Sequence, residues 1–451
     1  MASRQVVCVV AVALLAPVVA PLAGQAIVLP NYERVRIGQR EAHEAGAYVA
    51  RTSDAVAGWY NPAGLALSRG SGLNASANAE EWVRFRFGSA VNEVARSRLQ
   101  SIGSFVGAVL GAPVIKSDRW RLGISISRPI SWRPSAVSSA FSFTIPGGDE
   151  VMDYASDVEF SSWVPAVGVG YAASGALRLG LRVAGSVTHL SLEESLSDRL
   201  TAGGTAAFGQ REQTTDGDVY HVLFSAGIQW DLSRAATLGA HVTAPGVRLG
   251  GSSLLAGQRS TFTDTGSVDR TFRDPAATFD YQLPLRATVG LALRFTRVEI
   301  EADIAYVGAA DGYDMYASGD STRVTTVDSA GAATVTYGTV AAVRNSARRV
   351  VNLAVGGHYV VSRVVTLHAG VFTDRSPVED QTASRFIAID LLGVTGGVTV
   401  GGGRLKGSVG LAYSGGTSGT VSLGPSLGGR TGAAEVSIST LTLTYAVSFA
   451  L

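Results

Sequence analysis

The chain has 451 residues, of which only 16% are charged and 54 are glycine, and its formal net charge is +1. Soluble proteins carry about 25% charged residues and about 7% glycine, so the composition argues against an ordinary soluble domain, and the near-neutral charge gives no reason to expect a nucleic-acid partner. All-β barrels use this length as one domain, and a tightly curved sheet tolerates glycine at its bends.

Residues 1–26 have the order of regions that is typical of a secretory signal peptide. Arg4 is followed by an apolar run over residues 6–19 and then by small residues. The run is too short for a comfortable membrane-spanning helix. We therefore expect export, with cleavage between Ala23 and Ile27. An uncleaved N-terminal anchor is the alternative.

The segment over residues 46–66 has neither the period of a long helix nor that of a strand. It opens at Gly46 and closes in Asn61, Pro62, Ala63 and Gly64. Pro62 fixes its own φ and pushes Asn61 out of the α region, while Gly64 can adopt a left-handed conformation. The sequence therefore predicts a compact, turned element here.

Short segments with an apolar residue at every second position follow residue 73. The clearest, residues 298–306, has Ile300 and Ile304 on one face and Glu299, Glu301 and Asp303 on the other, so one face is apolar and the other wet. We count about fourteen such segments, an even number that is typical of single-chain outer-membrane barrels. They are expected at residues 73–87, 101–114, 120–134, 157–174, 177–195, 218–233, 236–252, 283–296, 298–308, 348–362, 364–378, 384–402, 403–416 and 437–451.

The connections between these segments alternate between short turns and long polar loops, which indicates a membrane barrel with turns on one rim and loops on the other. We predict an all-β, transmembrane, antiparallel barrel of about 14 strands whose inner faces are wet. A soluble β-sandwich with one wet face would also alternate and is the alternative fold. No second sheet or helix is evident that could cover so much apolar surface.

On residues 46–66 and the strands behind them, the chain resembles the FadL/TodX family of outer-membrane transporters for long-chain fatty acids and other hydrophobic compounds. The resemblance covers essentially the whole mature chain, and Asn61-Pro62-Ala63 is its most specific part. It implies a monomeric barrel in the cell outer membrane, plugged by an N-terminal hatch, that releases its ligand sideways through a gap in the third strand. We accordingly expect a signal peptide at 1–26, a hatch at 27–72 and a barrel at 73–451.

The resemblance also implies site residues. The third strand breaks its alternating pattern over residues 128–134, and Pro129 there cannot donate to the ladder. The lateral opening is therefore expected at Ser127, Arg128, Pro129 and Ser131. An exit of the strand from the membrane would explain Pro129 equally well. Apolar residues in the loops after the fifth and seventh strands are candidates for an outer capture groove, with packing of the loops on each other as the alternative. These residues are Leu196, Leu200, Phe208, Leu254, Leu255 and Phe262.

His358 and His368 face each other across the turn near Arg363 if the apolar faces of both strands meet lipid. Two imidazoles side by side can bind a metal ion or change charge near neutral pH. Because two ligands without a third are weak evidence, ordinary lumen polarity is the preferred interpretation, and no metal site is predicted.

No enzyme activity and no cofactor are predicted. Residues 424–428 match the Gly-x-Ser-x-Gly motif of serine hydrolases, but they lie in a glycine-rich loop and no histidine follows His368, whereas that motif needs a strand, a sharp turn, a helix and a later histidine. The predicted function is passive transport of a hydrophobic small molecule, a long-chain fatty acid or a hydrocarbon, through the plugged barrel with lateral release. The expected partners are that compound and outer-membrane lipid. The alternative is a secretion adaptor, because barrels of the PorV type share a similar N-terminal segment.

Overall fold

The computed structural model describes residues 29–32, 36–68, 71–88, 93–133, 137–145, 147–264, 266–320, 322–339, 343–379, 386–425 and 431–450. The predicted signal peptide lies outside these residues. No helix in the described part of the chain is both long enough and apolar enough to span a membrane.

Fourteen antiparallel strands form a closed barrel, as the sequence predicts. The ring closes between its first and last strands, which pair from Gly72 with Ala450 to Gly88 with Glu435. Taken around the barrel, the strands are β1 (Gly72–Gly88), β2 (Glu93–Leu110), β3 (Trp120–Trp132), β5 (Gly148–Ala172), β6 (Leu177–Ala202), β7 (Thr205–Asp231), β8 (Ala236–Thr243), β11 (Arg286–Arg294), β12 (Val298–Val307), β17 (Val350–Val360), β18 (Val365–Asp374), β19 (Leu391–Gly402), β20 (Leu405–Pro425) and β21 (Thr431–Ala450).

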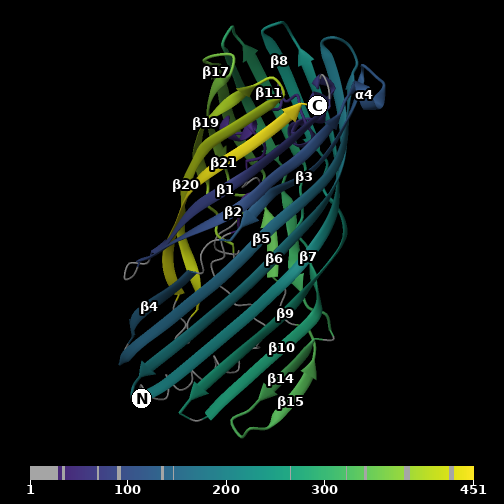
Figure 1. The fold of residues 1–451 in the computed structure, drawn as a ribbon. Helices are drawn as coiled ribbons and strands as arrows, with labels where there is room; N and C mark the ends of the chain where they lie inside the picture. Colours follow the sequence, from purple (N-terminus) through teal and green to yellow (C-terminus); the bar gives the residue numbers. More distant parts are fainter. Residues whose placement is uncertain are drawn as a thin grey trace.

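Further strands lengthen the wall at one end of the barrel. This end lies opposite to the one that carries α4 (Ala112–Ile115) (Figure 1). The prediction of long polar loops at this rim was therefore wrong: residues 196–202 and 205–217 continue β6 and β7. A two-residue turn joins them, with Gly203 and Gly204 both at positive φ, the geometry of a tight hairpin. The added strands are β4 (Val137–Ile145), β9 (Val247–Thr263), β10 (Gly266–Phe279), β13 (Ala310–Ala317), β14 (Arg323–Val327), β15 (Ala333–Tyr337) and β16 (Val343–Ala347).

The outer surface of the barrel is apolar, and β12 shows the alternation that the sequence predicts. Ile300 and Ile304 are 43% and 57% exposed, whereas Glu301 and Asp303 on the same strand are buried toward the lumen. Large exposed apolar side chains recur in the same way on the other strands of the ring. Such an extensive apolar surface on a closed barrel is the architecture of proteins that span the outer membrane with strands.

The lumen is apolar in the end of the barrel that carries the added strands, so the expectation of wet inner faces was wrong there. Residues 386–390, which belong to the segment 384–402 predicted as strand, precede β19, and Phe386, Ile387 and Ile389 are buried inside. We call the whole set the apolar lumen cluster: Tyr32, Val83, Ile130, Trp132, Phe141, Met152, Tyr154, Val158, Phe160, Leu190, Leu192, Leu196, Val219, Phe279, Tyr281, Val307, Met315, Tyr316, Val343, Val350, Val378, Phe386, Ile387, Ile389, Val436 and Ile438.

Residues 36–68, which we call the inner segment, lie within the lumen. They contain α2 (Arg40–His43), α3 (Ala57–Tyr60) and the 3-10 helix η1 (Pro62–Leu67). Their hydrogen bonds reach side chains all around the wall, from Ser76 on β1 and Gln229 on β7 to Thr444 on β21. The inner segment is therefore held by strands that are distant from it and from one another in the chain.

Inward-facing glycines make room for the inner segment. A Cβ atom at Gly227 would overlap Asn61, and one at Gly239 would overlap the backbone at Ala50. A strand glycine commonly marks such a close approach of another backbone, and this requirement accounts for part of the high glycine content. We call these positions the glycine girdle: Gly170, Gly180, Gly227, Gly239, Gly290, Gly356, Gly370, Gly397 and Gly410.

Candidate functional site

Arg51 of the inner segment links that segment to the wall. Its Nε donates to Glu301 of β12 at 2.9 Å, its Nη2 donates to the Ala47 carbonyl at 2.9 Å and forms an ion pair with Glu44, and its guanidinium carbon lies 4.2 Å from the centre of the Tyr48 ring. The side chains of Arg51, Glu44 and Glu301 are at most 1% exposed. A buried ion pair of this kind depends on both partners, because removing one leaves an uncompensated charge.

The two acidic side chains of β12 also bind backbone of the inner segment. Glu301 accepts a hydrogen bond from the N–H of Ala50 at 2.6 Å, and Asp303 accepts from the N–H groups of Tyr48 and Val49 at 2.9 and 3.2 Å. A turned segment without strand partners has orphan N–H groups, and each would be costly if it were buried unpaired. The carboxylates of β12 remove that cost.

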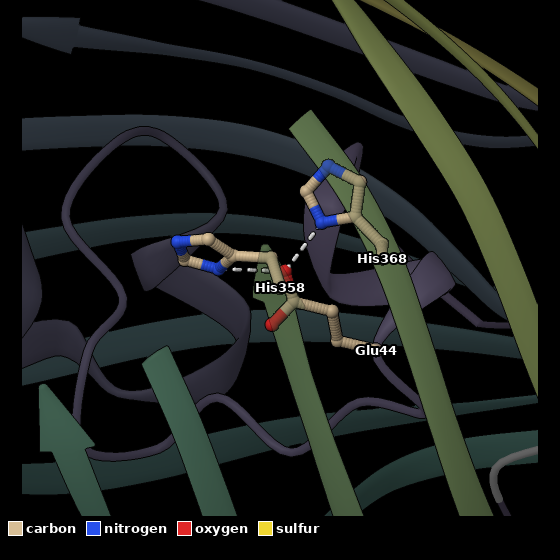
Figure 2. A group of neighbouring side chains, drawn as sticks. All are labelled: Glu44, His358 and His368. Atoms are coloured by element: carbon tan, nitrogen blue, oxygen red, sulfur yellow. Dashed lines mark hydrogen bonds and ion pairs between the residues drawn. The ribbon is translucent and has the colours of Figure 1, made fainter. Parts of the chain in front are cut away.

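His358 and His368 are direct neighbours on β17 and β18, as the predicted register requires. Both turn a ring nitrogen, Nδ1, toward the same carboxylate oxygen of Glu44, at 3.2 and 2.5 Å (Figure 2). His368 also contacts the Thr399 hydroxyl through Nε2 at 2.8 Å. The sequence shows the histidine pair but gives no sign of Glu44, which lies more than 300 positions away.

Two glutamates of the same turn have opposite electrostatic environments. Burial opposes the ionised form of Glu44, but hydrogen bonds from His358 and His368, together with Arg51, outweigh it and lower the pKa of Glu44 below its usual range. Burial raises the pKa of Glu41 to about 7, and the nearby Asp54 adds to the effect. Glu44 is thus anionic near neutral pH, whereas Glu41 is largely protonated in weak acid.

Docking of the inner segment should weaken as pH rises from about 4.5 to about 7. Because the pKa of Glu41 is raised on burial, the bound proton stabilises the docked segment fully below the ordinary value of 4.5 and no longer does so above about 7. The shift corresponds to a free-energy change on the order of 3 kcal/mol. In Glu41→Gln, which mimics the protonated acid, amide hydrogen exchange in residues 40–60 should lose this excess pH dependence. The control Glu159→Gln removes an exposed carboxylate and should keep the excess pH dependence. Identical exchange profiles against pH for wild type and Glu41→Gln would contradict the assignment of this dependence to Glu41.

The residues predicted for the hatch each have a definite contact. The Asn61 side chain donates to the carbonyls of Val49, Ile228 and Ala240 at 2.8 to 3.3 Å and accepts from the N–H of Ala63 at 3.1 Å. It therefore caps η1 and at the same time fixes it to β7 and β8. Gly46 has a positive φ of 77°, and a Cβ at Gly64 would overlap the Thr52 backbone. Pro62 and Ala63 are buried against Gly180 of β6.

The wall is interrupted at the residues predicted for the lateral opening. The β2–β3 ladder ends at the pair Phe105–Ser127, and no later residue of β3 pairs with β2 in the described part of the chain. On the other side, the β3–β5 register slips between Ser127 and Ile130, so that Arg128 and Pro129 together oppose Trp163. This is the geometry of a bulge, which proline favours because it has no N–H to donate. Whether the interruption opens stays a prediction.

A cavity of about 90 Å³ lies on the lumen side of this interruption, and we call it the kink cavity. Pro129 and Ile130 of β3, Trp59 of the inner segment and Leu223 of β7 supply apolar wall, while Arg182 supplies a charge. A second cavity of about 80 Å³ shares Tyr32, Tyr60, Arg286 and Thr288 with it. The two cavities are thus neighbours separated by side chains rather than by the sheet.

The lipid-facing side of the same wall region carries an apolar hollow. It is lined by outward residues of β2, β3, β5 and β6, among them Val106, Ile124, Ile126 and Val183, each of which is at least 41% exposed. Pro165 of β5, which also lacks an N–H, lies in this hollow and pairs with Ile126. The apolar hollow therefore lies beside the interruption, against residues 124–126 of β3, which still pair with β2.

Arg182 is a buried cation beside the kink cavity. Arg182 is only 5% exposed, and its guanidinium carbon lies 5.5 Å from the centre of the Trp59 ring. Its Nε has no hydrogen-bond partner among the described residues. A buried charge is costly unless a counter-charge or hydrogen bonds compensate it. The cavity is therefore suited to a ligand that brings an anionic group.

The residues predicted for ligand capture lie on strands rather than in loops. Leu196 and Leu200 are buried on β6, and Leu255 is buried on β9. Phe208 and Phe262 pair across β7 and β9 with ring centres 6.0 Å apart, and Phe262 is 43% exposed, while Leu254 is half-buried. Their placement in loops was wrong because the strands continue through this region, and the capture role stays a prediction.

Sequence reasoning missed Glu44, Arg51, Trp59 and Arg182. Only Arg182 carries a usable signal, because it is a charge at an inward position of β6. The other three belong to the inner segment, whose contacts have no period.

No protein-family model matches the sequence, and no curated protein matches it. Solved structures do resemble the fold. A FadL homologue from Pseudomonas aeruginosa has a TM-score of 0.60 at 14% identity, covering 95% of this chain and 100% of that chain. The P. putida toluene transporter TodX has a TM-score of 0.60 at 16% identity, covering 93% and 99%. The Ralstonia pickettii toluene transporter TbuX has a TM-score of 0.55 at 15% identity, also covering 93% and 99%. The chain therefore has the fold of these barrels.

Proposed function

We propose that the protein is an outer-membrane channel for passive transport of a small hydrophobic compound, which leaves the barrel sideways at the interruption in β3. The observation that carries the proposal is the kink cavity, because it adjoins Pro129 and Ile130 from inside while the apolar hollow adjoins Ile126 and Pro165 from outside. A hydrophobic compound that moved between them would avoid water throughout, which is favourable for apolar surface. The toluene transporters that share the fold support the same class of compound.

The apolar lumen cluster supplies the upstream part of this route. Tyr32 and Ile130 belong to the cluster and also line the kink cavity. A wide polar pore would offer a hydrophobic compound no advantage, whereas a lumen filled with apolar side chains does. Passage then requires side chains to move, because the cluster is closely packed.

The size and charge of the cavity narrow the class of ligand. An apolar cavity of roughly 150 Å³ can hold benzene, so the kink cavity alone is small for a ring, and the two neighbouring cavities together reach that size. Separation of Tyr32 and Tyr60 would join them. Arg182 favours a compound with a carboxylate at one end, such as a fatty acid or an aromatic acid, over a pure hydrocarbon.

In this proposal the inner segment is the plug that prevents leakage of polar solutes. It occupies the lumen against the glycine girdle and is held by Arg51, Glu301 and Asp303. Residues 27–72 would then be the hatch and residues 73–451 the wall. The transport route runs beside the plug, between Trp59 and β3.

Uptake into cells tests the function. Cells that express the protein should accumulate a radiolabelled long-chain fatty acid faster than cells carrying an empty vector. Arg182→Met should lower that uptake by about tenfold or more, since a hydrogen bond to a charged group contributes about 1.5–3 kcal/mol. Uptake of toluene should change little, because it has no carboxylate.

Arg234→Met is the matched control, because Arg234 is exposed in the turn between β7 and β8. It should leave the uptake of both compounds unchanged. If neither compound enters faster than in vector cells, the transport proposal fails. Recovery of a stable complex with a secreted protein from the same cells would then favour a secretion adaptor.

A further inference from the structure

We propose that Glu44, His358 and His368 form a binding site for a transition-metal dication of the zinc class. One ligand atom from each residue lies within 4.8 Å of the other two. Two strands and the inner segment contribute these groups, so the ion would join parts of the molecule that only the fold brings together (Figure 2). The proposal does not depend on transport.

The geometry is close to what such an ion needs. Ligand atoms on a tetrahedral zinc ion are roughly 3.3 Å apart, given zinc–ligand distances of about 2.0–2.1 Å. The Glu44 carboxylate oxygen lies 3.2 Å from Nδ1 of His358 and 2.5 Å from Nδ1 of His368. Opening the shorter contact by less than about 1 Å would therefore admit the ion. All three donors belong to side chains that are at most 13% exposed.

The chemistry of the donors selects the class of ion. Two imidazole nitrogens and one carboxylate oxygen suit zinc, nickel, copper or ferrous iron, whereas calcium and magnesium prefer oxygen ligands only. Three protein ligands leave a further position for water. The ring of His368 is also oriented from behind, because its Nε2 contacts the Thr399 hydroxyl at 2.8 Å, an arrangement typical of metal-binding histidines.

The surrounding charges favour a cation in spite of Arg51. Three buried carboxylates, those of Glu44, Glu301 and Asp303, are gathered near this one buried guanidinium. A bound dication would favour the ionised form of all three carboxylates, and three negative charges against one positive charge leave an excess of two for it to balance.

Arg51 also leaves most of the site free for an ion. It pairs with the Glu44 oxygen Oε2, so that Oε1 remains directed at the histidines. Only its 3.2 Å contact with Nδ1 of His358 would have to be given up. That nitrogen now lies between a donor and an acceptor, which cannot both be satisfied by one tautomer.

Zinc titration tests the site. The protein, purified in detergent without a histidine tag and freed of metal with a chelator, should bind one zinc ion per chain at pH 8 in competition with a chromophoric chelator. His358→Ala, His368→Ala and Glu44→Gln should each weaken binding by about 100-fold or more, beyond what outer-shell substitutions cost. His221→Ala is the control, because His221 is a buried lumen histidine of β7 that does not belong to the proposed metal site. It should leave the affinity unchanged.

Thr399→Val keeps all three ligands and should weaken zinc binding by about tenfold, so the proposal stays testable if a ligand variant fails to fold. Cobalt should give a visible absorption band in wild type and in His221→Ala, and no band in His368→Ala. Absence of zinc binding by folded wild-type protein would overturn the proposal. Protonated histidines would then balance the negative charge of the carboxylates. Equal zinc affinity in wild type and His368→Ala would overturn it as well.

Discussion

Arg51→Met should release the inner segment from the barrel and make the protein leak. Removing one partner of a buried ion pair costs about 3–5 kcal/mol, and Arg51 is the partner of both Glu44 and Glu301. Such a loss raises the undocked fraction by about 100- to 5000-fold. The closed ladder of the barrel does not involve this side chain, so the wall should assemble normally. Single-channel conductance in planar bilayers should rise, and cells should become sensitive to large hydrophilic antibiotics.

Arg294→Met is the matched control for this prediction. Arg294 also pairs with a glutamate of β12, Glu299, at 2.7 Å, but its side chain is 42% exposed. A solvent-exposed pair contributes only about 0–1 kcal/mol, so conductance should stay at the wild-type level. A folded Arg51→Met barrel that remained sealed would show that the inner segment is not held by this network or does not close the lumen.

Ser127→Trp should abolish uptake of the transported compound without preventing assembly. Ser127 is 1% exposed, donates to the Val164 carbonyl, and is the last residue of β3 that pairs with β2. An indole at this position would fill space between the kink cavity and the interruption. Overpacking of this kind costs about 1–3 kcal/mol, which a fourteen-stranded barrel can tolerate. Fatty-acid uptake measured as above should fall to the vector level.

Two further variants decide what such a loss means. Ser131→Trp, on the other side of Pro129, should have the same effect. Ile304→Trp adds the same bulk to the lipid face of β12, where Ile304 is 57% exposed, and should leave uptake intact. Normal uptake by a correctly assembled Ser127→Trp protein would exclude a route through this part of the wall.

The wall of the barrel could be predicted from the sequence because its signal is local. On β12 the alternation of Ile300 and Ile304 with Glu301 and Asp303 determines which face meets lipid, and the same period of two recurs on other described strands of the ring, such as β5 and β6. Register follows from the short turns, which is why the pairing of His358 with His368 could be predicted from Arg363.

The far end of the barrel was predicted less well, for two physical reasons. Residues 205–217 are rich in polar residues and therefore resemble a loop. Where a strand extends beyond the membrane, its outward face does not need to be apolar. Two consecutive glycines, Gly203 and Gly204, are typical of a tight hairpin turn. Such a turn indicates that the strands on both sides of it continue up to these residues.

The candidate site could be predicted only in part, because its contacts are not periodic. Asn61 and Pro129 stand out through turn and ladder chemistry that acts within a few residues. Glu44, in contrast, meets His368 across 324 positions, and nothing near Glu44 in the sequence indicates that partner. Arg182 stands out as an inward charge on its strand, but the cavity that gives it importance is enclosed by several distant strands.

The glycine girdle determines an order of assembly. Its members lie on strands from β5 to β20, so the surface that receives the inner segment is complete only after nearly all of the wall has formed. The inner segment is synthesised first, yet contacts such as that between His43 and Thr444 span 401 positions and belong to the slow, non-local class. We therefore expect the inner segment to enter the lumen only after most of the wall has formed.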